Sequence, residues 1–294
     1  MYVRSTGYER SLQDAAMQNS YVFDPESPAE LARLINQDRL ITSAMGGPLA
    51  GLPDTSSWNA ILDVACGPGS WVLDVAFEQP DIEVAGVDLC LSMVEYAWAR
   101  ARSQYLSNAS FGVMDIAQPL DFSDATFDLV NARFLIGVLQ RDAWQPFLSE
   151  CRRVLKPGGV LRLTETENMG FTNSPAFQRL SSLGAQAMAR LGYGLAPDTL
   201  LLTPFLPELL QQAGFLHVQT QYHTLDFSRT ANAWFDQFSN AILITLQAQP
   251  MIREQCLISQ EELEQLHSQM QVEMQQATFR GTWTFMSALG VNAR

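Results

Sequence analysis

The chain has 294 residues, 47% of them hydrophobic, and a formal net charge of −13 at pH 7. A chain of this length and composition can form one large domain or two small ones around a full hydrophobic core, which excludes a disordered protein. Only Lys156 among the 18 basic residues is a lysine. Because nucleic-acid binding needs a basic face, we expect no nucleic-acid partner and a small, uncharged or weakly cationic substrate instead.

The sequence shows no membrane or secretory segment. No window approaches the roughly 18 to 20 apolar residues of a membrane span, and the first residues lack the basic start and apolar stretch of a signal peptide. We therefore expect no membrane partner and a cytoplasmic protein. Because Cys66, Cys90, Cys151 and Cys256 are widely spaced and form no C-x-x-C pair, we expect reduced thiols and no metal site.

An N-terminal helical cap is predicted over residues 1–57, ahead of five strands. Its main helix begins at the capping-box pattern Ser27-Pro-Ala-Glu30, with proline at the first helical position. The apolar runs that follow are separated by enough residues for crossover helices, one of which begins at the capping box Ser92-Met-Val-Glu95. This spacing predicts a parallel sheet covered on both faces. The runs are 60–65, 82–87, 109–114, 127–132 and 159–165.

The second half of the chain is predicted to add helical insertions and two more strands to a core over residues 58–168. The insertions are expected to form a lid or substrate-binding wall on one compact domain. The last helix, 259–277, opens with the capping box Ser259-Gln-Glu-Glu262. Its apolar face suits both a lid and a dimer surface, so a homodimer stays open. The insertions are 169–214 and 230–279, and the strands are 215–226 and 282–289.

The first predicted strand ends in a glycine loop, AILDVACGPGSW at residues 60–71. A dinucleotide fingerprint would need glycine where Val72 stands, and a phosphate loop is absent, so NAD is disfavoured. Asp63, Asp88 and Asp115 lie at three successive strand ends. A carboxylate at Asp88 can accept both hydroxyls of a ribose, and Asp115 can accept from an adenine amino group. Three acids would repel a pyrophosphate but not an adenosine attached to a cationic sulfonium.

With these motifs the chain resembles the class I S-adenosylmethionine-dependent methyltransferases. The similarity implies an α/β fold with a Rossmann-like, doubly wound, seven-stranded sheet of order 3-2-1-4-5-7-6, whose last strand is antiparallel. One departure is Ala65, where many members carry glycine. The matching segments are ILDVACGPG at 61–69, GVDL at 86–89 followed by Met93, MDI at 114–116, FDLVN at 127–131 and RVLKPGGV at 153–160.

The resemblance implies S-adenosyl-L-methionine as cofactor and S-adenosyl-L-homocysteine as product, and it assigns cofactor-binding residues. Tyr21, in the preceding cap, is expected to cover the cofactor. Cys66 and Met114 belong to the same motifs. The implied contacts are Asp63, Ala65, Gly67 and Gly69 around the methionine part, Asn131 facing its amine, Asp88 and Leu89 on the ribose, Met93 near the adenine, and Asp115 with Ile116 at the adenine edge and face.

The catalytic candidates follow from what such a cofactor needs. Its methyl group is already activated, so the protein must hold an acceptor atom in line and exclude water. Glu165 and Glu167 follow the fifth strand, where alternation puts them on one side, and either could orient the acceptor or take a proton. Arg133 could bind a substrate carboxylate or pair with one of these glutamates. His223, on the sixth strand, is a further candidate base.

The predicted cap and insertions are rich in aromatic residues and methionines. They favour a greasy pocket for an isoprenoid, polyketide or aromatic acceptor, as in natural-product chemistry. Two other functions stay open: a regulatory or scaffold protein that binds the cofactor without methyl transfer, and an oxidoreductase on a related sheet, which the missing glycine disfavours. The aromatic residues concerned are Tyr21, Phe23, Phe171, Phe177, Tyr193, Trp234, Phe235 and Phe238.

Overall fold

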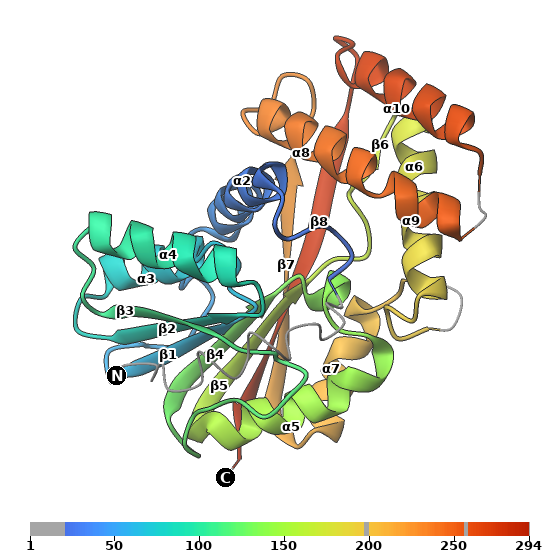
Figure 1. Cartoon of the computed structure of the whole chain (residues 1–294). Helices are drawn as coiled ribbons and strands as arrows, with labels where there is room; N and C mark the ends of the chain where they lie inside the picture. The colour runs from blue at the N-terminus through green and yellow to red at the C-terminus, as the bar shows by residue number, and fades with distance from the viewer. Residues whose placement is uncertain (1–20, 197–199, 256–257, 294) are drawn as a thin grey trace.

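The computed structural model of the chain describes residues 21–196, 200–255 and 258–293, which fold around one mixed sheet (Figure 1). The strands follow the order β3-β2-β1-β4-β5-β8, with β7 on the far edge of β8 and the short β6 continuing the edge that β5 occupies. Strands β1 to β5 are parallel, and β8 is antiparallel to each of its neighbours. The strands are β1 (Ala60–Val64), β2 (Glu83–Asp88), β3 (Ala109–Val113), β4 (Phe127–Arg133), β5 (Leu155–Glu165), β6 (Phe171–Thr172), β7 (Phe215–Asp226) and β8 (Gly281–Asn292).

This strand order confirms the predicted one, because β7 and β8 take the places of the predicted sixth and seventh strands. The two-residue β6 was not predicted. Strand β8 extends to Asn292 rather than to residue 289, since Gly290 and Val291 still pair with β5 and Val291 and Asn292 with β7. Strand β5 begins at Leu155 rather than at residue 159.

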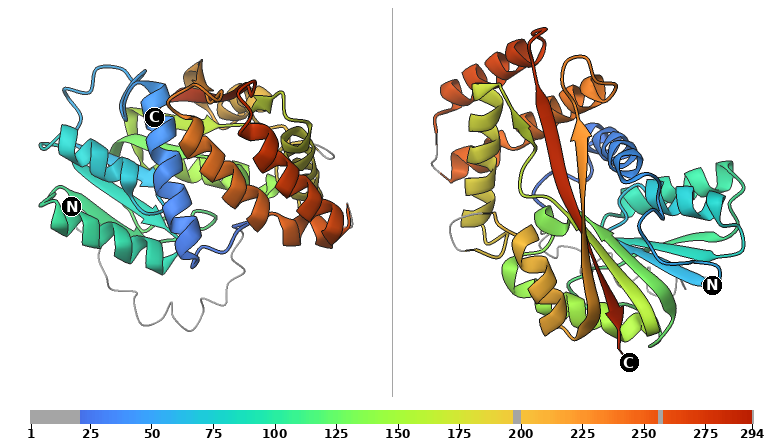
Figure 2. Two further views of the ribbon diagram at one scale, coloured as in Figure 1. Left: turned by 90° about the horizontal axis from the view of Figure 1, so that it is seen from above. Right: turned by 180° about the vertical axis from the view of Figure 1, so that it is seen from behind.

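Helices cover both faces of the sheet and form a separate group at one end. Helices α3 and α4 cover one face and α5 and α7 the other, while α6, α8, α9 and α10 gather beyond the upper ends of β7 and β8 (Figures 1 and 2). Helix α2 packs on both α3 and α8. The helices are α2 (Pro28–Met45), α3 (Ser70–Glu78), α4 (Leu91–Ser103), α5 (Trp144–Val154), α6 (Pro175–Arg190), α7 (Leu206–Gln212), α8 (Trp234–Gln247), α9 (Gln249–Glu254) and α10 (Gln260–Met274), with short 3-10 turns η1 (Leu135–Gly137), η2 (Arg141–Ala143) and η3 (Thr203–Phe205).

Alternate residues of the parallel strands face opposite helical layers. Leu62 and Val64 belong to the apolar core that contains α5 and α7, whereas Ile61 belongs to the core that contains α3 and α4. Because side chains alternate along a strand, Asp63 faces the same layer as Ile61. A third apolar core joins the helical group to β8.

Of the three predicted capping boxes, only that of α10 forms a side-chain cap. The Ser259 hydroxyl accepts a hydrogen bond from the backbone N–H of Glu262 at 3.2 Å. Ser27 precedes α2 but caps nothing with its side chain, and Glu30, the other residue of the predicted box, accepts from the buried Arg33. Ser92 lies inside α4, which begins after Cys90.

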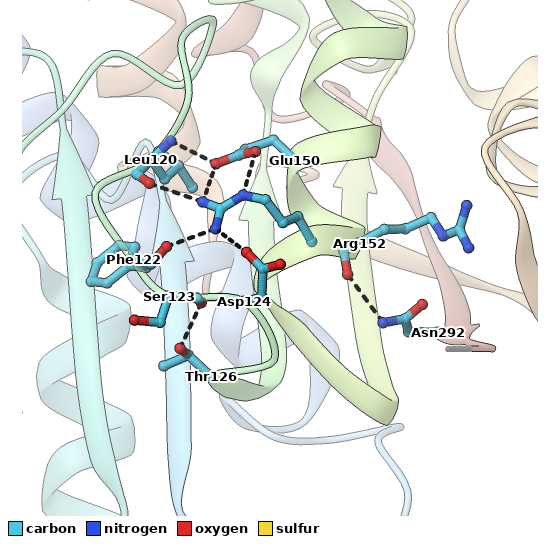
Figure 3. Close-up of polar contacts among 9 residues, drawn as sticks. Leu120, Phe122, Ser123, Asp124, Thr126, Glu150, Arg152 and Asn292 are labelled. Carbon is cyan, nitrogen blue, oxygen red and sulfur yellow. Dashed lines mark hydrogen bonds and ion pairs between the residues drawn. The ribbon is translucent and has the colours of Figure 1, made fainter.

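The segment between β3 and β4, which begins with Met114 and Asp115, is fixed to α5. Arg153 donates to the carbonyl oxygens of Leu120 and Phe122, at 2.9 and 2.7 Å, and forms ion pairs with Asp124 and Glu150 (Figure 3). Glu150 in turn accepts from the backbone N–H of Leu120 at 2.7 Å. Arg153, near the end of α5, therefore holds this loop in place.

Two kinds of site are absent from the described residues. Within them, no helix is long and apolar enough to cross a bilayer, and no group of three or more His, Cys, Asp or Glu side chains is placed to hold a metal ion. Cys66, Cys90 and Cys151 are free thiols. Cys256 lies outside the described residues.

Candidate cofactor and acceptor site

A cavity of about 1660 Å³, its mouth included, opens where the carboxyl ends of β1, β2 and β3 meet α2 and the helical group. Gly67, Asp88 and Asp115 line one end of it, and Met188 and Met251, on α6 and α9, line the other. A smaller cavity of about 470 Å³ adjoins it. The two share the wall formed by Leu34, Gln37, Ala65, Gly67, Arg133 and Phe134.

The glycine loop turns sharply from β1 into α3. Ala65, Gly67 and Gly69 all have positive φ angles, of 53°, 53° and 73°. At Gly69 a Cβ atom would lie 2.5 Å from the Phe111 ring and 2.7 Å from the Cβ of Ala97, so the position requires glycine. At Ala65 the chain carries the backbone strain that a glycine would avoid.

Asp88 ends β2 at the cavity wall and organises the loops on both sides of it. Its carboxylate accepts from the backbone N–H of Gly67 at 2.8 Å and of Cys90 at 2.9 Å. Burial raises the pKa of Asp88 above its ordinary value. The neighbouring Leu89 and Met93 line the same cavity. A ligand hydroxyl could donate to the remaining lone pairs of this carboxylate.

The predicted adenine motif lies at the same end of the cavity. Met114, Asp115 and Ile116 all line it, and the Asp115 carboxylate accepts from the backbone N–H of Ala117 at 2.8 Å. The glycine loop and the segments that follow β2 and β3, which the family resemblance assigned to one ligand, therefore line the same cavity.

Asp63 and Cys66 line the smaller cavity. Asp63 is 3% exposed and accepts from the side-chain amide of Asn131 at 2.6 Å. Burial raises the pKa of Asp63 to about 7, and it raises the pKa of the Cys66 thiol well above its ordinary value. Asn131 and Gly69 line neither cavity and act behind the wall.

Tyr21 lines the large cavity, but its hydroxyl is engaged. It donates to Glu30 at 2.5 Å, and Arg33 donates to it at 3.3 Å. Arg33 also donates to Gln37 at 2.5 Å and to Asn240 of α8 at 3.1 Å. Sequence reasoning missed this polar wall, although Glu30 and Arg33 stand at the i, i+3 spacing of a helical ion pair.

Glu165 is the last residue of β5 and Glu167 follows it, and the two side chains have different surroundings. Glu165 is fully buried, lines neither cavity, and accepts from the backbone N–H groups of Leu135 and Ile136 at 2.7 and 3.3 Å. Glu167 lines the large cavity and accepts from the backbone N–H and the hydroxyl of Thr203, both at 2.5 Å. The expected alternation fails because β5 ends at Glu165.

The other two catalytic candidates also have structural partners. Arg133 lines both cavities, but it forms its ion pair with Asp38 of α2 rather than with a glutamate. His223 lines neither cavity; its Nε2 shares a hydrogen bond of 3.1 Å with the Ser287 hydroxyl, and its ring stacks on Phe285. Burial lowers the pKa of His223.

We expect Glu165 to make the protein less stable as the pH rises. Burial raises its pKa to about 8, above the ordinary 4.5, so its contribution to stability is complete at low pH and is lost as the pH rises toward 8. In Glu165→Gln this loss, on the order of 3 kcal/mol, should disappear. Urea unfolding at pH 5.5 and pH 9 measures it, and equal declines in both proteins would show that Glu165 ionises freely.

Comparison with known proteins agrees with the motifs. Residues 61–159 match the model of a family described as a methyltransferase domain. The chain is 31% identical over 181 residues to a demethylmenaquinone methyltransferase of Deinococcus radiodurans, a match that covers 59% of this chain and 73% of the relative. It is 30% identical over 171 residues to a protein of Aspergillus luteorubrus named as a probable methyltransferase, covering 56% of this chain. That match spans 59% of the fungal protein, less than two thirds of its length.

Solved structures show the same fold. The chain superposes with a TM-score of 0.50 on the Haemonchus contortus phosphoethanolamine N-methyltransferase 2 complex with S-adenosylhomocysteine, at 21% identity, covering 86% of this chain and 52% of that one. It superposes with the same TM-score on the YcgJ protein of Bacillus subtilis, at 16% identity, covering 80% and 92%.

The fold, the motifs and the relatives of this chain are those of the class I S-adenosylmethionine-dependent methyltransferases. The chain belongs to this family, with S-adenosyl-L-methionine as its cofactor, and the oxidoreductase alternative is wrong. Asp88 and Asp115 line the large cavity and Asp63 the smaller one, and three such carboxylates suit a ligand that bears a sulfonium, an ammonium and hydroxyl groups.

Proposed function

We propose that this protein transfers the methyl group of S-adenosylmethionine to a small apolar or aromatic acceptor bound in the helical end of the same cavity. The observation that carries the proposal is the continuity of that cavity from Asp88 to Met251. The relatives of this chain, which include demethylmenaquinone methyltransferases, support such an acceptor. The wall at this end is largely apolar: Met169, Gly184, Ala185, Met188, Ile244 and Trp283.

The residues of this chain would mainly bind, orient and exclude water. The cofactor supplies the activated methyl group when bound. Asp88 would accept from the ribose hydroxyls, Asp115 from the adenine amino group, and Asp63 from the ammonium group. The apolar wall would keep water from the methyl group and hold the acceptor atom in line with it, and such positioning contributes roughly 7 to 11 kcal/mol.

This proposal requires no general base from the chain. Among the described residues that line the acceptor end, Glu167 is the carboxylate, and Thr203 occupies one of its oxygens twice. Arg33 and Arg133, which also line the cavity, are ion-paired. We therefore propose an acceptor that is nucleophilic without help, such as an enolisable carbon, an amine or an acidic phenol. The insertions act as its lid in this proposal; whether α10 also forms a dimer surface stays a prediction.

Gly184 provides a test confined to the acceptor end. A Cβ on this α6 residue would meet no atom within 4 Å, so Gly184→Phe should place a ring in the cavity. We expect cofactor affinity to stay unchanged while turnover falls roughly 100-fold, because the acceptor can no longer lie in line with the methyl group. Calorimetry with S-adenosylmethionine and assay of S-adenosylhomocysteine release measure the two effects.

Gly184→Ala is the matched control. It should keep full turnover and stabilise α6 by about 0.5–1 kcal/mol, because alanine is the better helix former. Undiminished turnover in Gly184→Phe would place the acceptor elsewhere.

A further inference from the structure

Three polar side chains form a row across the middle of the sheet. Asp63 of β1 is the register partner of Asn131 of β4, which is the register partner of Arg162 of β5. Their exposed fractions are 3%, 0% and 1%. Arginine is almost never fully buried unless it is paired, so the partners of Arg162 show what it does.

The hydrogen bonds in this row have a fixed direction. Arg162 Nε lies 2.7 Å from Asn131 Oδ1, and Asn131 Nδ2 lies 2.6 Å from Asp63 Oδ1. A guanidinium can only donate, so it requires the amide oxygen of Asn131 to face it. The amide nitrogen must then face Asp63, and Asp63 must accept.

The Arg162 guanidinium also contacts two residues close to the glycine loop, Pro48 and Trp71. Its Nη2 donates to the carbonyl oxygen of Pro48 at 2.7 Å, and Trp71 of α3 donates to the same oxygen at 3.0 Å. The guanidinium also lies 5.4 Å from the centre of the Trp71 ring. One buried cation therefore joins β5, the segment after α2 and the first turn of α3.

We propose that Arg162 is a positioning residue that fixes the Asn131 amide and so keeps Asp63 an ionised hydrogen-bond acceptor at the smaller cavity. The proposal rests on the role proposed above for Asp63 in binding the ammonium group of the cofactor. Arg162 itself lines neither cavity, so it acts through Asn131.

The charges around Asp63 give the proposal a pH signature. Arg133, Arg162 and the hydrogen bond from Asn131 favour its ionised form, whereas burial and Asp38 oppose it. Burial is the largest effect and raises the pKa of Asp63 to about 7. Without Arg162 a positive charge is lost, and Asn131 can turn its oxygen toward Asp63, which favours the protonated acid. As the pH falls, a variant without Arg162 should then lose cofactor binding at a higher pH than the wild type does.

The experiment is calorimetric titration of wild type, Arg162→Gln and Arg162→Lys with S-adenosylmethionine between about pH 5.5 and pH 9. We expect Arg162→Gln to bind roughly 10-fold more weakly at pH 7, with the acid limb of its binding curve moved up by about one pH unit. Arg162→Lys, which keeps the charge, should restore part of the shift. Asp63→Asn should bind weakly with no acid limb in this range.

Methylthioadenosine, which lacks the amino-acid part, separates positioning from general damage. Its affinity should be the same in wild type and Arg162→Gln, because Asp88 and Asp115 are untouched. Acid limbs that coincide in the wild type and the Arg162 variants, or equal losses for both ligands, would overturn the proposal. If Arg162→Gln does not fold, the comparison of Arg162→Lys with wild type decides in the same way. Failure of the wild type to bind S-adenosylmethionine would instead contradict the proposed function.

Discussion

Asp88→Ala is expected to weaken the binding of S-adenosylmethionine by about 100-fold or more. A carboxylate that accepts two ribose hydroxyls contributes about 1.5–3 kcal/mol for each hydrogen bond. The same side chain accepts from Gly67 and Cys90, so its loss also releases the glycine loop and the start of α4. Both effects act in the same direction. Calorimetry with the cofactor and with S-adenosylhomocysteine measures them.

Two variants show whether the effect is specific. Asp88→Asn keeps the shape and one acceptor oxygen, so its affinity should lie between those of wild type and Asp88→Ala. Glu83→Ala removes an exposed acid from the opposite end of β2 and should leave binding unchanged. Equal affinities for wild type and Asp88→Ala would refute the assignment of the ribose site.

Gly69→Ala is expected to lower the free energy of unfolding by about 2–6 kcal/mol. A non-glycine residue with a positive φ pays about 1–3 kcal/mol, and forcing a methyl group against a packed core adds about 1–3 kcal/mol. The clash is with Phe111 of β3 and Ala97 of α4. Urea unfolding of the purified variant measures the change.

Gly158→Ala separates the two contributions to that loss. Gly158 has a φ of 78°, close to the 73° of Gly69, but a Cβ there would meet nothing within 4 Å. It should therefore show the backbone effect alone. If both variants were equally destabilised, the close packing of the glycine loop on β3 and α4 would have no energetic importance.

The sequence predicted the parts of the molecule that depend on local pattern. Branched runs followed by turns gave β1 to β4 within a residue or two, and the spacing of Asp63, Asp88 and Asp115 placed three acids at adjacent strand ends. Strand order was available only through family resemblance, because periodicity does not say which strands are neighbours.

The partners of the candidate catalytic residues, and those of the positioning residue Arg162, could not be predicted in this way. Glu165 accepts from η1, Arg133 pairs with Asp38, and Arg162 reaches Pro48, all across long stretches of chain. Such contacts exist only once the helices and the sheet have packed. The one sign of these contacts in the sequence was an arginine within an apolar strand, and which residues it would contact depended on the strand register.

The most direct test of the account is incubation of the protein with methyl-labelled S-adenosylmethionine and a panel of apolar acceptors, namely hydroquinones, phenols, enolisable diketones and aromatic amines. The account predicts label in at least one acceptor, with matching release of S-adenosylhomocysteine, and loss of both in Asp88→Ala and in Gly184→Phe. Tight cofactor binding with no label in any acceptor would contradict it and favour a protein that binds the cofactor without transferring the methyl group.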